Sequence, residues 1–233
     1  MRRNYDQLIK TNPEEIHVMN GIRFISAFII VIVHQFMFLL MSPVSNTLNI
    51  KKDYESVLAI LILHAEVVVD TFFAMSGLLH VRGLMGDSGR QKNLFSVLWK
   101  RYLRLIGPLA VVIYYLIFVA KYAGSGPFWP KAYSEEPEIC ANNWRLSLMM
   151  LNTNFKEICH SVTWYTACDY QLTILGTMLF YFYQRDKKLG YTAFGTAALL
   201  SVVIPGAFVY WHRLPALPFP DLISIRNVRH NEP

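Results

Sequence analysis

The stretch "NGIRFISAFIIVIVHQFMFLLMS", Asn20 to Ser42, decides the fold. It is apolar over the length that a helix needs to cross a hydrocarbon core of about 30 Å. It nevertheless carries Arg23 near its start and His34 near its middle. Because a charge at membrane depth costs at least about 2.5 kcal/mol, these two polar side chains need a structural or a functional reason.

The composition of the whole chain is that of an integral membrane protein. Of its 233 residues, 54% are hydrophobic and 14% aromatic, and the mean hydropathy is +0.30. Apolar runs of about 20 residues, the length of a spanning helix, recur along the sequence. We expect an all-α, polytopic membrane helix bundle with about five transmembrane helices, over Ile22–Met41, Val57–His80, Leu103–Tyr122, Val162–Tyr183 and Tyr191–Trp211.

The basic residues indicate orientation in a membrane and not a nucleic-acid partner. The formal net charge is +6, but Lys and Arg gather between apolar runs, over Arg82–Arg104 and over Arg185–Lys188. Loops of this kind face the cytosol. We therefore expect a cytosolic N-terminus, residence in the plasma membrane or in an endomembrane such as the endoplasmic reticulum, and one sizeable external loop over Ala123–Ser161.

The chain has three cysteines. Cys140 and Cys159 both fall in the expected external loop, where an oxidising compartment permits a disulfide. Cys168 falls inside the fourth apolar run and is expected to be a small buried side chain. The sequence has no Cys or His spacing typical of a metal site, so we expect no metal.

Arg23 and His34 lie on one face of their predicted helix. Eleven residues at 100° each bring the second side chain within about 20° of the first, about 16 Å further along the axis. This arrangement suits a general base that is reached from the cytosol. In the structural alternative, Arg23 extends to the cytosolic headgroups and His34 hydrogen-bonds a neighbouring helix.

Asp70 is the polar residue in the middle of the second run. If this run is antiparallel to the first, the depths of Asp70 and His34 nearly coincide. A carboxylate beside His34 would fix its tautomer and raise its basicity, although a purely structural hydrogen bond is the alternative. Ser76 and Gly77, further along the run, predict a close approach by another backbone.

Arg101 and Arg104 lie three residues apart at the entrance of the third run. Two guanidinium groups on one helix face form a fork that suits phosphates, because arginine makes planar bidentate hydrogen bonds. The alternative is that they only obey the positive-inside rule. In the fourth run, Asp169 and Gln171 need polar partners and are expected to line the acceptor side of a cavity.

Five stretches follow one another in an order that resembles a known family. They are "NGIRFISAFIIVIVH", "VVVDTFFAMSGLL", "KRYLRLIGPLAVVI", "GPFWP" and "TWYTACDYQL". In their order and spacing the chain resembles the membrane acyltransferase 3 family, and within it the animal nose-resistant-to-fluoxetine branch. Members resemble bundles of about ten spans, so we expect a chain truncated at both ends. It divides into a cytosolic segment 1–18, a partial acyltransferase 3 membrane domain 19–211 and an irregular tail 212–233.

The resemblance implies an acyltransferase that moves an acyl group from a cytosolic acyl-CoA-type donor to a hydroxyl of a lumenal or membrane acceptor, a lipid or a glycan. It implies no bound cofactor. His34 matches the catalytic residue of the family's Arg-(ten residues)-His motif, which begins at Arg23, and Asp70 matches its second-helix motif. Arg101 and Arg104 match its Arg-x-x-Arg motif, which engages the donor, and Arg23 is expected to help hold the donor phosphates.

Two other functions stay open. In a transporter or a lipid- or xenobiotic-handling membrane protein, the same polar stripe would line a path and no bond would break. Paired broken helices in inverted repeats would favour that function, and the five runs show none. The third possibility is an inactive fragment that acts through interactions.

Overall fold

The computed structural model describes residues 17–41, 66–85, 93–126, 129, 136–154 and 159–213. This part of the chain contains helices and turns and no strand. The predicted N-terminal segment 1–18 and tail 212–233 lie outside the described residues, except for 17, 18, 212 and 213.

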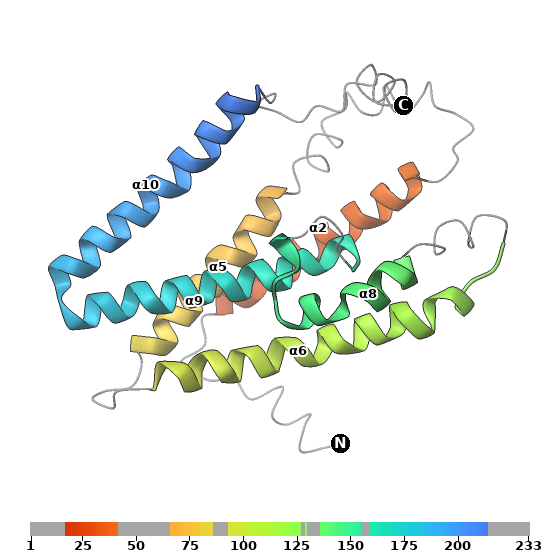
Figure 1. The fold of residues 1–233 in the computed structure, drawn as a ribbon, viewed down its shortest axis with the longest axis horizontal. Helices are drawn as coiled ribbons and strands as arrows, with labels where there is room; N and C mark the ends of the chain where they lie inside the picture. Colours follow the sequence, from red (N-terminus) through yellow and green to blue (C-terminus); the bar gives the residue numbers. More distant parts are fainter. Residues whose placement is uncertain are drawn as a thin grey trace. The chain divides into compact units, whose positions relative to one another are not determined.

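Long helices follow the five apolar runs (Figure 1). They are α2 His17–Met41, α5 Glu66–Met85, α6 Leu94–Phe118, α9 Trp164–Arg185 and α10 Lys187–His212. The shorter elements are α8 Glu136–Leu148 and the 3-10 turns η1 Ala120–Tyr122, η2 Asn152–Asn154 and η3 Ser161–Thr163. The predicted all-α fold is confirmed.

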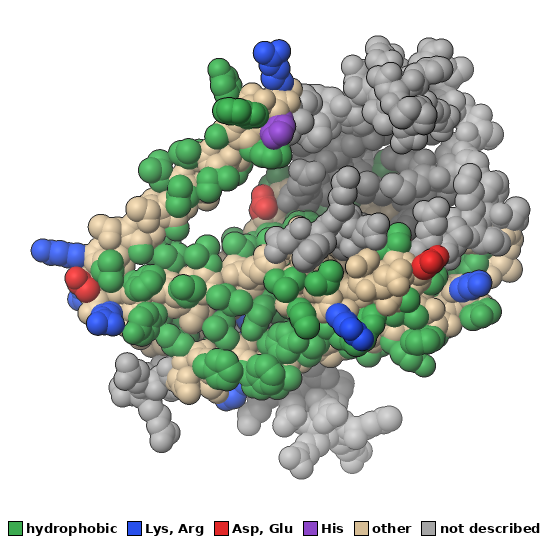
Figure 2. All heavy atoms as spheres, viewed as in Figure 1, with side chains coloured by type: hydrophobic (Ala, Val, Ile, Leu, Met, Phe, Trp, Pro, Cys, Tyr) green, Lys and Arg blue, Asp and Glu red, His purple; other side chains and the backbone are tan. Residues whose placement is uncertain are grey.

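Four of the described helices are long and apolar enough to span a membrane. The segments are Val18–Phe36, Val67–Met85, Leu94–Phe118 and Lys187–His212. Many of their large hydrophobic side chains are exposed, which is expected of helices that lipid surrounds. The face drawn in Figure 2 shows hydrophobic side chains over α6, α9 and α10. The fourth run forms α9, but Asp169 and Gln171 make this helix more polar than the other four.

Helix α6 begins earlier than the sequence predicted. The side chain of Asn93 accepts a hydrogen bond from the backbone N–H of Phe95 at 3.1 Å, and this N-cap starts the helix at Leu94. The basic residues that were expected at the edge of the third run therefore lie inside the helix. Arg101 is seven residues beyond the start of α6, about 10 Å along its axis.

The chain divides into two compact units, Met1–Gly176 and Thr177–Pro233, and each is described by itself. In the second unit, Asp186 begins α10 by accepting a hydrogen bond from the N–H of Lys188 at 2.9 Å. Gly190 packs against Tyr183, where an added Cβ would lie 2.4 Å from the Cα atom of Tyr183. A side chain at position 190 would therefore force the two helices apart at this turn.

In the first unit, α8 folds back along α6 (Figure 1). The buried core between the two helices and the start of α9 contains Leu109, Ile113, Leu116, Ala120, Cys140, Met150, Cys159 and Ala167. The hydroxyl of Tyr102 donates to the carbonyl of Leu148 at 3.1 Å, which fixes the end of α8 near the first third of α6. The stretch that was expected to be an external loop is thus partly a packed helix.

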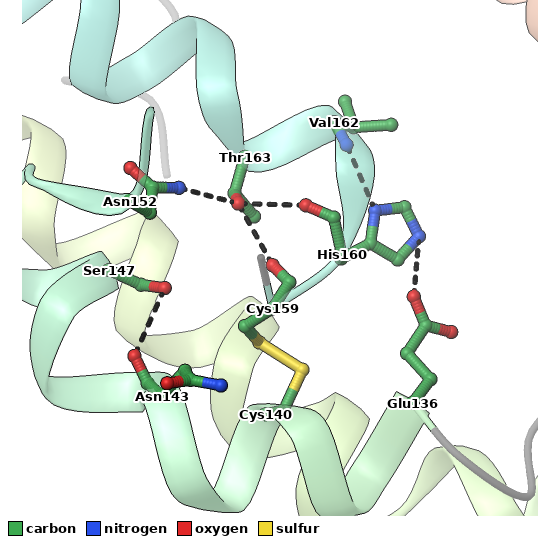
Figure 3. Close-up of a disulfide and its surroundings, with 9 residues drawn as sticks. All are labelled: Glu136, Cys140, Asn143, Ser147, Asn152, Cys159, His160, Val162 and Thr163. Atoms are coloured by element: carbon green, nitrogen blue, oxygen red, sulfur yellow. Dashed lines mark hydrogen bonds and ion pairs between the residues drawn. A yellow bond between two sulfur atoms is a disulfide. The ribbon is translucent and has the colours of Figure 1, made fainter. Parts of the chain in front are cut away.

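Cys140 of α8 and Cys159 form the disulfide that the sequence predicts (Figure 3). Both cysteines are fully buried, and their Cα atoms are 4.3 Å apart. Beside the bridge, the hydroxyl of Thr163 donates to the carbonyl of Cys159, and the amide of Asn152 donates to Thr163, both at 2.9 Å. The bridge and these hydrogen bonds hold α8 to the turn that starts α9. Cys168 is a free, half-buried thiol.

Removing the bridge should destabilise the first unit. The two cysteines are 19 residues apart, so Cys140→Ser with Cys159→Ser should lower the free energy of unfolding by about 3 kcal/mol. Unfolding of the purified protein in detergent, with and without a reductant, measures this effect. Cys168→Ser is the matched control and should behave as the wild type. Equal stability of the oxidised and reduced wild type would contradict the prediction.

Candidate functional site

Ser76, Arg101 and Asp169 join α5, α6 and α9. The Nη2 atom of Arg101 donates to Oδ2 of Asp169 at 2.7 Å and also to the hydroxyl oxygen of Ser76. The hydroxyl of Ser76 in turn donates to Oδ1 of Asp169 at 2.6 Å. We call these three residues the three-helix clamp, because each comes from a different helix.

The clamp is poorly accessible to water. The side chain of Asp169 is 8% exposed and that of Arg101 is 21% exposed. In such surroundings each charge depends on the other, since removing one partner leaves a buried charge without compensation. Only Nη2 of the guanidinium group makes these contacts, and Nε of Arg101 is buried without a hydrogen-bond partner among the described atoms. The pair is therefore not the bidentate form that arginine makes with carboxylates at its strongest.

The hydroxyl of Ser76, and not the neighbouring glycine, makes a polar contact from α5 to α9. A Cβ atom built on Gly77 would meet nothing within 4 Å, so the predicted close backbone approach at this position is not found. Small size at position 77 is not what the clamp requires. It requires a hydroxyl that donates to one partner and accepts from the other.

His80 extends the clamp along α5. It lies one turn after Ser76 on the same helix face and within electrostatic range of Arg101 and Asp169. Sequence analysis assigned no role to His80 because it stands near the end of its apolar run. Its spacing of four residues from Ser76 was the available signal.

Tyr165 extends the clamp along α9. It lies one turn before Asp169, within electrostatic range of Asp169, Arg101 and Arg23. Its ring packs on that of Phe73, with 4.8 Å between the centroids. The spacing of four residues between Tyr165 and Asp169 is the sequence signal for a role of Tyr165 at this site.

His34 is oriented by the backbone of its own helix. Its Nδ1 atom lies 2.8 Å from the carbonyl oxygen of Ile30. A carbonyl oxygen only accepts hydrogen bonds, so Nδ1 carries the proton and Nε2 of the neutral imidazole holds a lone pair. In the neutral form, this half-buried ring presents a lone pair at Nε2, which a general base requires.

The structure does not bring Asp70 to His34, which corrects the predicted contact. The hydroxyl oxygens of Ser26 and Thr71 are 3.2 Å apart and set the register of α2 and α5, which run in opposite directions (Figure 1). His34 is eight residues beyond Ser26, about 12 Å further along α2, whereas Asp70 adjoins Thr71. The side chain of Asp70 is exposed. The depth estimate failed because side-chain contacts, and not the ends of apolar runs, set the register.

The two arginines of the predicted fork lie in different environments. Arg101 is held in the clamp, where Asp169 neutralises its charge. Arg104 is exposed, and the described part of the chain gives it no hydrogen bond or ion pair. Arg23 is half-buried near the start of α2. Among the described residues, no carboxylate pairs with Arg104 or with Arg23.

Asp169 lies beside Arg101, whereas the sequence predicted that it lines the acceptor side of a cavity. The chain returns along α6 through α8, so α9 starts at a level where its first turns meet Arg101. Gln171 contributes to this placement, since its Nε2 atom donates to the carbonyl of Met150 at 2.7 Å. The packing of α8 back along α6 was not expected from the sequence.

The residues of this site lie in a stretch of sequence that known proteins share. Residues 16–219 match the family model described as the acyltransferase domain of the acyltransferase 3 type. The chain belongs to this family. The expected roles of Arg23, His34 and the arginine pair in that family stay predictions for this chain.

A protein of similar sequence is the nose resistant to fluoxetine protein 6 of Caenorhabditis elegans. The two sequences are 27% identical over 219 residues, which cover 83% of this chain and 26% of that protein. The chain therefore spans about a quarter of the length of that relative. No solved structure matches the chain. The resemblance inferred from the five motifs is confirmed.

The clamp predicts how the free energies of unfolding of the wild type, two single variants and their double variant compare. Asp169→Leu and Arg101→Met alone should each lower the free energy of unfolding by about 3 kcal/mol, because each leaves a buried charge unpaired. The double variant should be more stable than either single variant, since it buries no charge. Denaturant unfolding of the purified protein in detergent gives all four values. Losses that simply add in the double variant would show that the two residues do not interact.

Proposed function

We propose that the protein transfers an acyl group from a cytosolic thioester donor of the acyl-CoA type to a hydroxyl of a lumenal or membrane acceptor, a lipid or a glycan. Its membership of the acyltransferase 3 family and its apolar helices support acyl transfer within a membrane. The observation that carries the proposal is the hydrogen bond between Nδ1 of His34 and the carbonyl of Ile30. We place the N-terminus in the cytosol, on the charge distribution of the loops.

His34 acts as the general base in this proposal. Its Nε2 atom takes the proton of the acceptor hydroxyl while the hydroxyl oxygen attacks the thioester carbonyl carbon. The carbon–sulfur bond then breaks, and the proton passes from Nε2 to the leaving thiolate. The carbonyl of Ile30 fixes the ring during both transfers, which is the role that the sequence had suggested for Asp70.

The donor is inferred from the distance between cationic and basic groups. Arg23 and His34 lie on one face of α2, about 16 Å apart along the axis. A ligand that reaches both carries phosphates at one end and a thioester at the end of an extended arm, as acyl-CoA does. Arg104 is available to the same phosphates because nothing in the described protein neutralises it.

His34→Ala should abolish catalysis and leave donor binding intact. At saturating donor, we expect the transfer rate to fall at least about 100-fold, since a general base contributes about that much. Transfer of a radiolabelled acyl group in membranes that contain the protein, with coenzyme A binding measured in parallel, tests this. Gln35→Ala, at the exposed next residue, is the control and should retain the rate.

Asp70→Asn separates the two accounts of how His34 is oriented. A nearly unchanged rate supports the carbonyl of Ile30, and a loss as large as that of His34→Ala supports the carboxylate. Undiminished transfer by His34→Ala itself would remove the base and favour the transport or lipid-handling alternative.

Arg104→Lys should act on the donor and not on the chemistry. Lysine keeps the charge but loses the bidentate fork, so we expect a higher KM for the donor with a similar kcat. Initial rates over a range of acyl-CoA concentrations measure both constants. A fall in kcat without a change in KM would argue against a phosphate contact at this residue.

A further inference from the structure

Arg101 already holds an anion inside the protein. Its Nη2 atom is 2.7 Å from Oδ2 of Asp169, and Ser76 holds the other carboxylate oxygen at 2.6 Å. Arg104, three residues later on the same helix, has no such partner among the described residues. The two arginines of the motif therefore differ by one internal carboxylate.

We propose that Asp169 is an internal counter-ion that opposes the phosphates of the donor at Arg101 and so weakens the binding of both the donor and its coenzyme A product. This inference rests on the proposed function, because it takes the donor to carry phosphates that reach Arg101. It gives Asp169 a role on the donor side, in place of the acceptor-side role that the sequence suggested.

A phosphate can approach Arg101 without opening the clamp, because the side chain of Arg101 is 21% exposed. Nη2 serves both Asp169 and Ser76, while Nε is buried and has no partner among the described atoms. Burial closes Nε to a ligand, so the donor that a phosphate oxygen can reach is Nη1, which makes no hydrogen bond among the described residues. A phosphate at Nη1 would lie near the carboxylate of Asp169 in a region with little water, where like charges repel more strongly than in solution.

The clamp keeps this carboxylate in place. Asp169 is bonded through both oxygens, one to Ser76 and one to Arg101, so it cannot turn away from an arriving anion without losing a hydrogen bond. The repulsion is therefore built into the folded state. It acts equally on donor and product, because acyl-CoA and coenzyme A carry the same phosphates.

Weaker binding of the donor and product phosphates is useful in catalysis. Binding energy that is shared by the ground state, the transition state and the product does not speed the chemical step, and it slows product release. A carboxylate beside one of two arginines lowers this shared binding. Arg104 can then attract the donor phosphates, while Arg101 sets their position.

The test is the affinity for coenzyme A of the purified full chain in detergent. Asp169→Asn removes the charge and keeps an oxygen that accepts from Arg101. We expect its Kd for coenzyme A to fall about tenfold, which is the effect of strengthening one charge-assisted contact. Pantetheine, which lacks phosphates, should bind the variant and the wild type equally.

Two further variants show whether the effect passes through Arg101. Ser76→Ala removes a hydrogen bond of the clamp but no charge, and it should not tighten binding. In the background of Arg101→Gln, adding Asp169→Asn should leave the Kd unchanged. If the Asn variant does not fold, Asp169→Thr, which is also neutral and hydrogen-bonding, makes the same measurement.

Each outcome decides the proposal. An Asp169→Asn variant that binds coenzyme A no more tightly than the wild type overturns it and leaves Asp169 a structural residue, without touching the proposed function. Tightening that persists without Arg101 also overturns it. If neither wild type nor variants bind coenzyme A, the proposed donor is wrong and this inference falls with it.

Discussion

The buried ion pair between Arg101 and Asp169 is the constraint on which the first unit of the structure depends. Helices in lipid gain little from hydrophobic burial against one another, so packing and polar contacts decide which helices associate. A charged group that enters this region must find its opposite charge nearby. The hydroxyl of Ser76 completes the contact by bonding both partners. Together these three side chains determine which faces of α5, α6 and α9 meet.

Two groups of polar side chains in the first unit lie at different levels. The first is the clamp with His80 and Tyr165 beside it, and Tyr165 lies within electrostatic range of Arg23 near the start of α2. His34 lies about 16 Å further along the same helix. In the proposed reaction, a donor with distant reactive and anionic ends would need two sites, and α2 would carry a residue of each.

The sequence predicted what kind of residues form the site better than it predicted their contacts. Apolar runs located the long helices because the bilayer sets their length. Asp169 was identified as a polar residue that needs a partner and Arg101 as part of a phosphate-binding fork, yet their contact with each other was not predicted. The error has a physical cause: α8 packs back along α6 and shifts the level at which α9 begins. In the same way, the contact of Ser26 with Thr71 sets a register that keeps Asp70 away from His34.

Formation of the disulfide is expected to precede full assembly of the clamp as the chain folds. Thiols stay reduced in the cytosol, so Cys140 and Cys159 can join only in an oxidising compartment. The bridge holds α8 to the turn from which α9 starts, and that start places Asp169 opposite Arg101. Before oxidation, the newly made chain lacks one of the ties that bring the carboxylate to the guanidinium group. Maturation of the clamp is thus linked to the redox state of the compartment that holds these two cysteines, and a chain retained in a reducing environment would carry a less firmly paired charge.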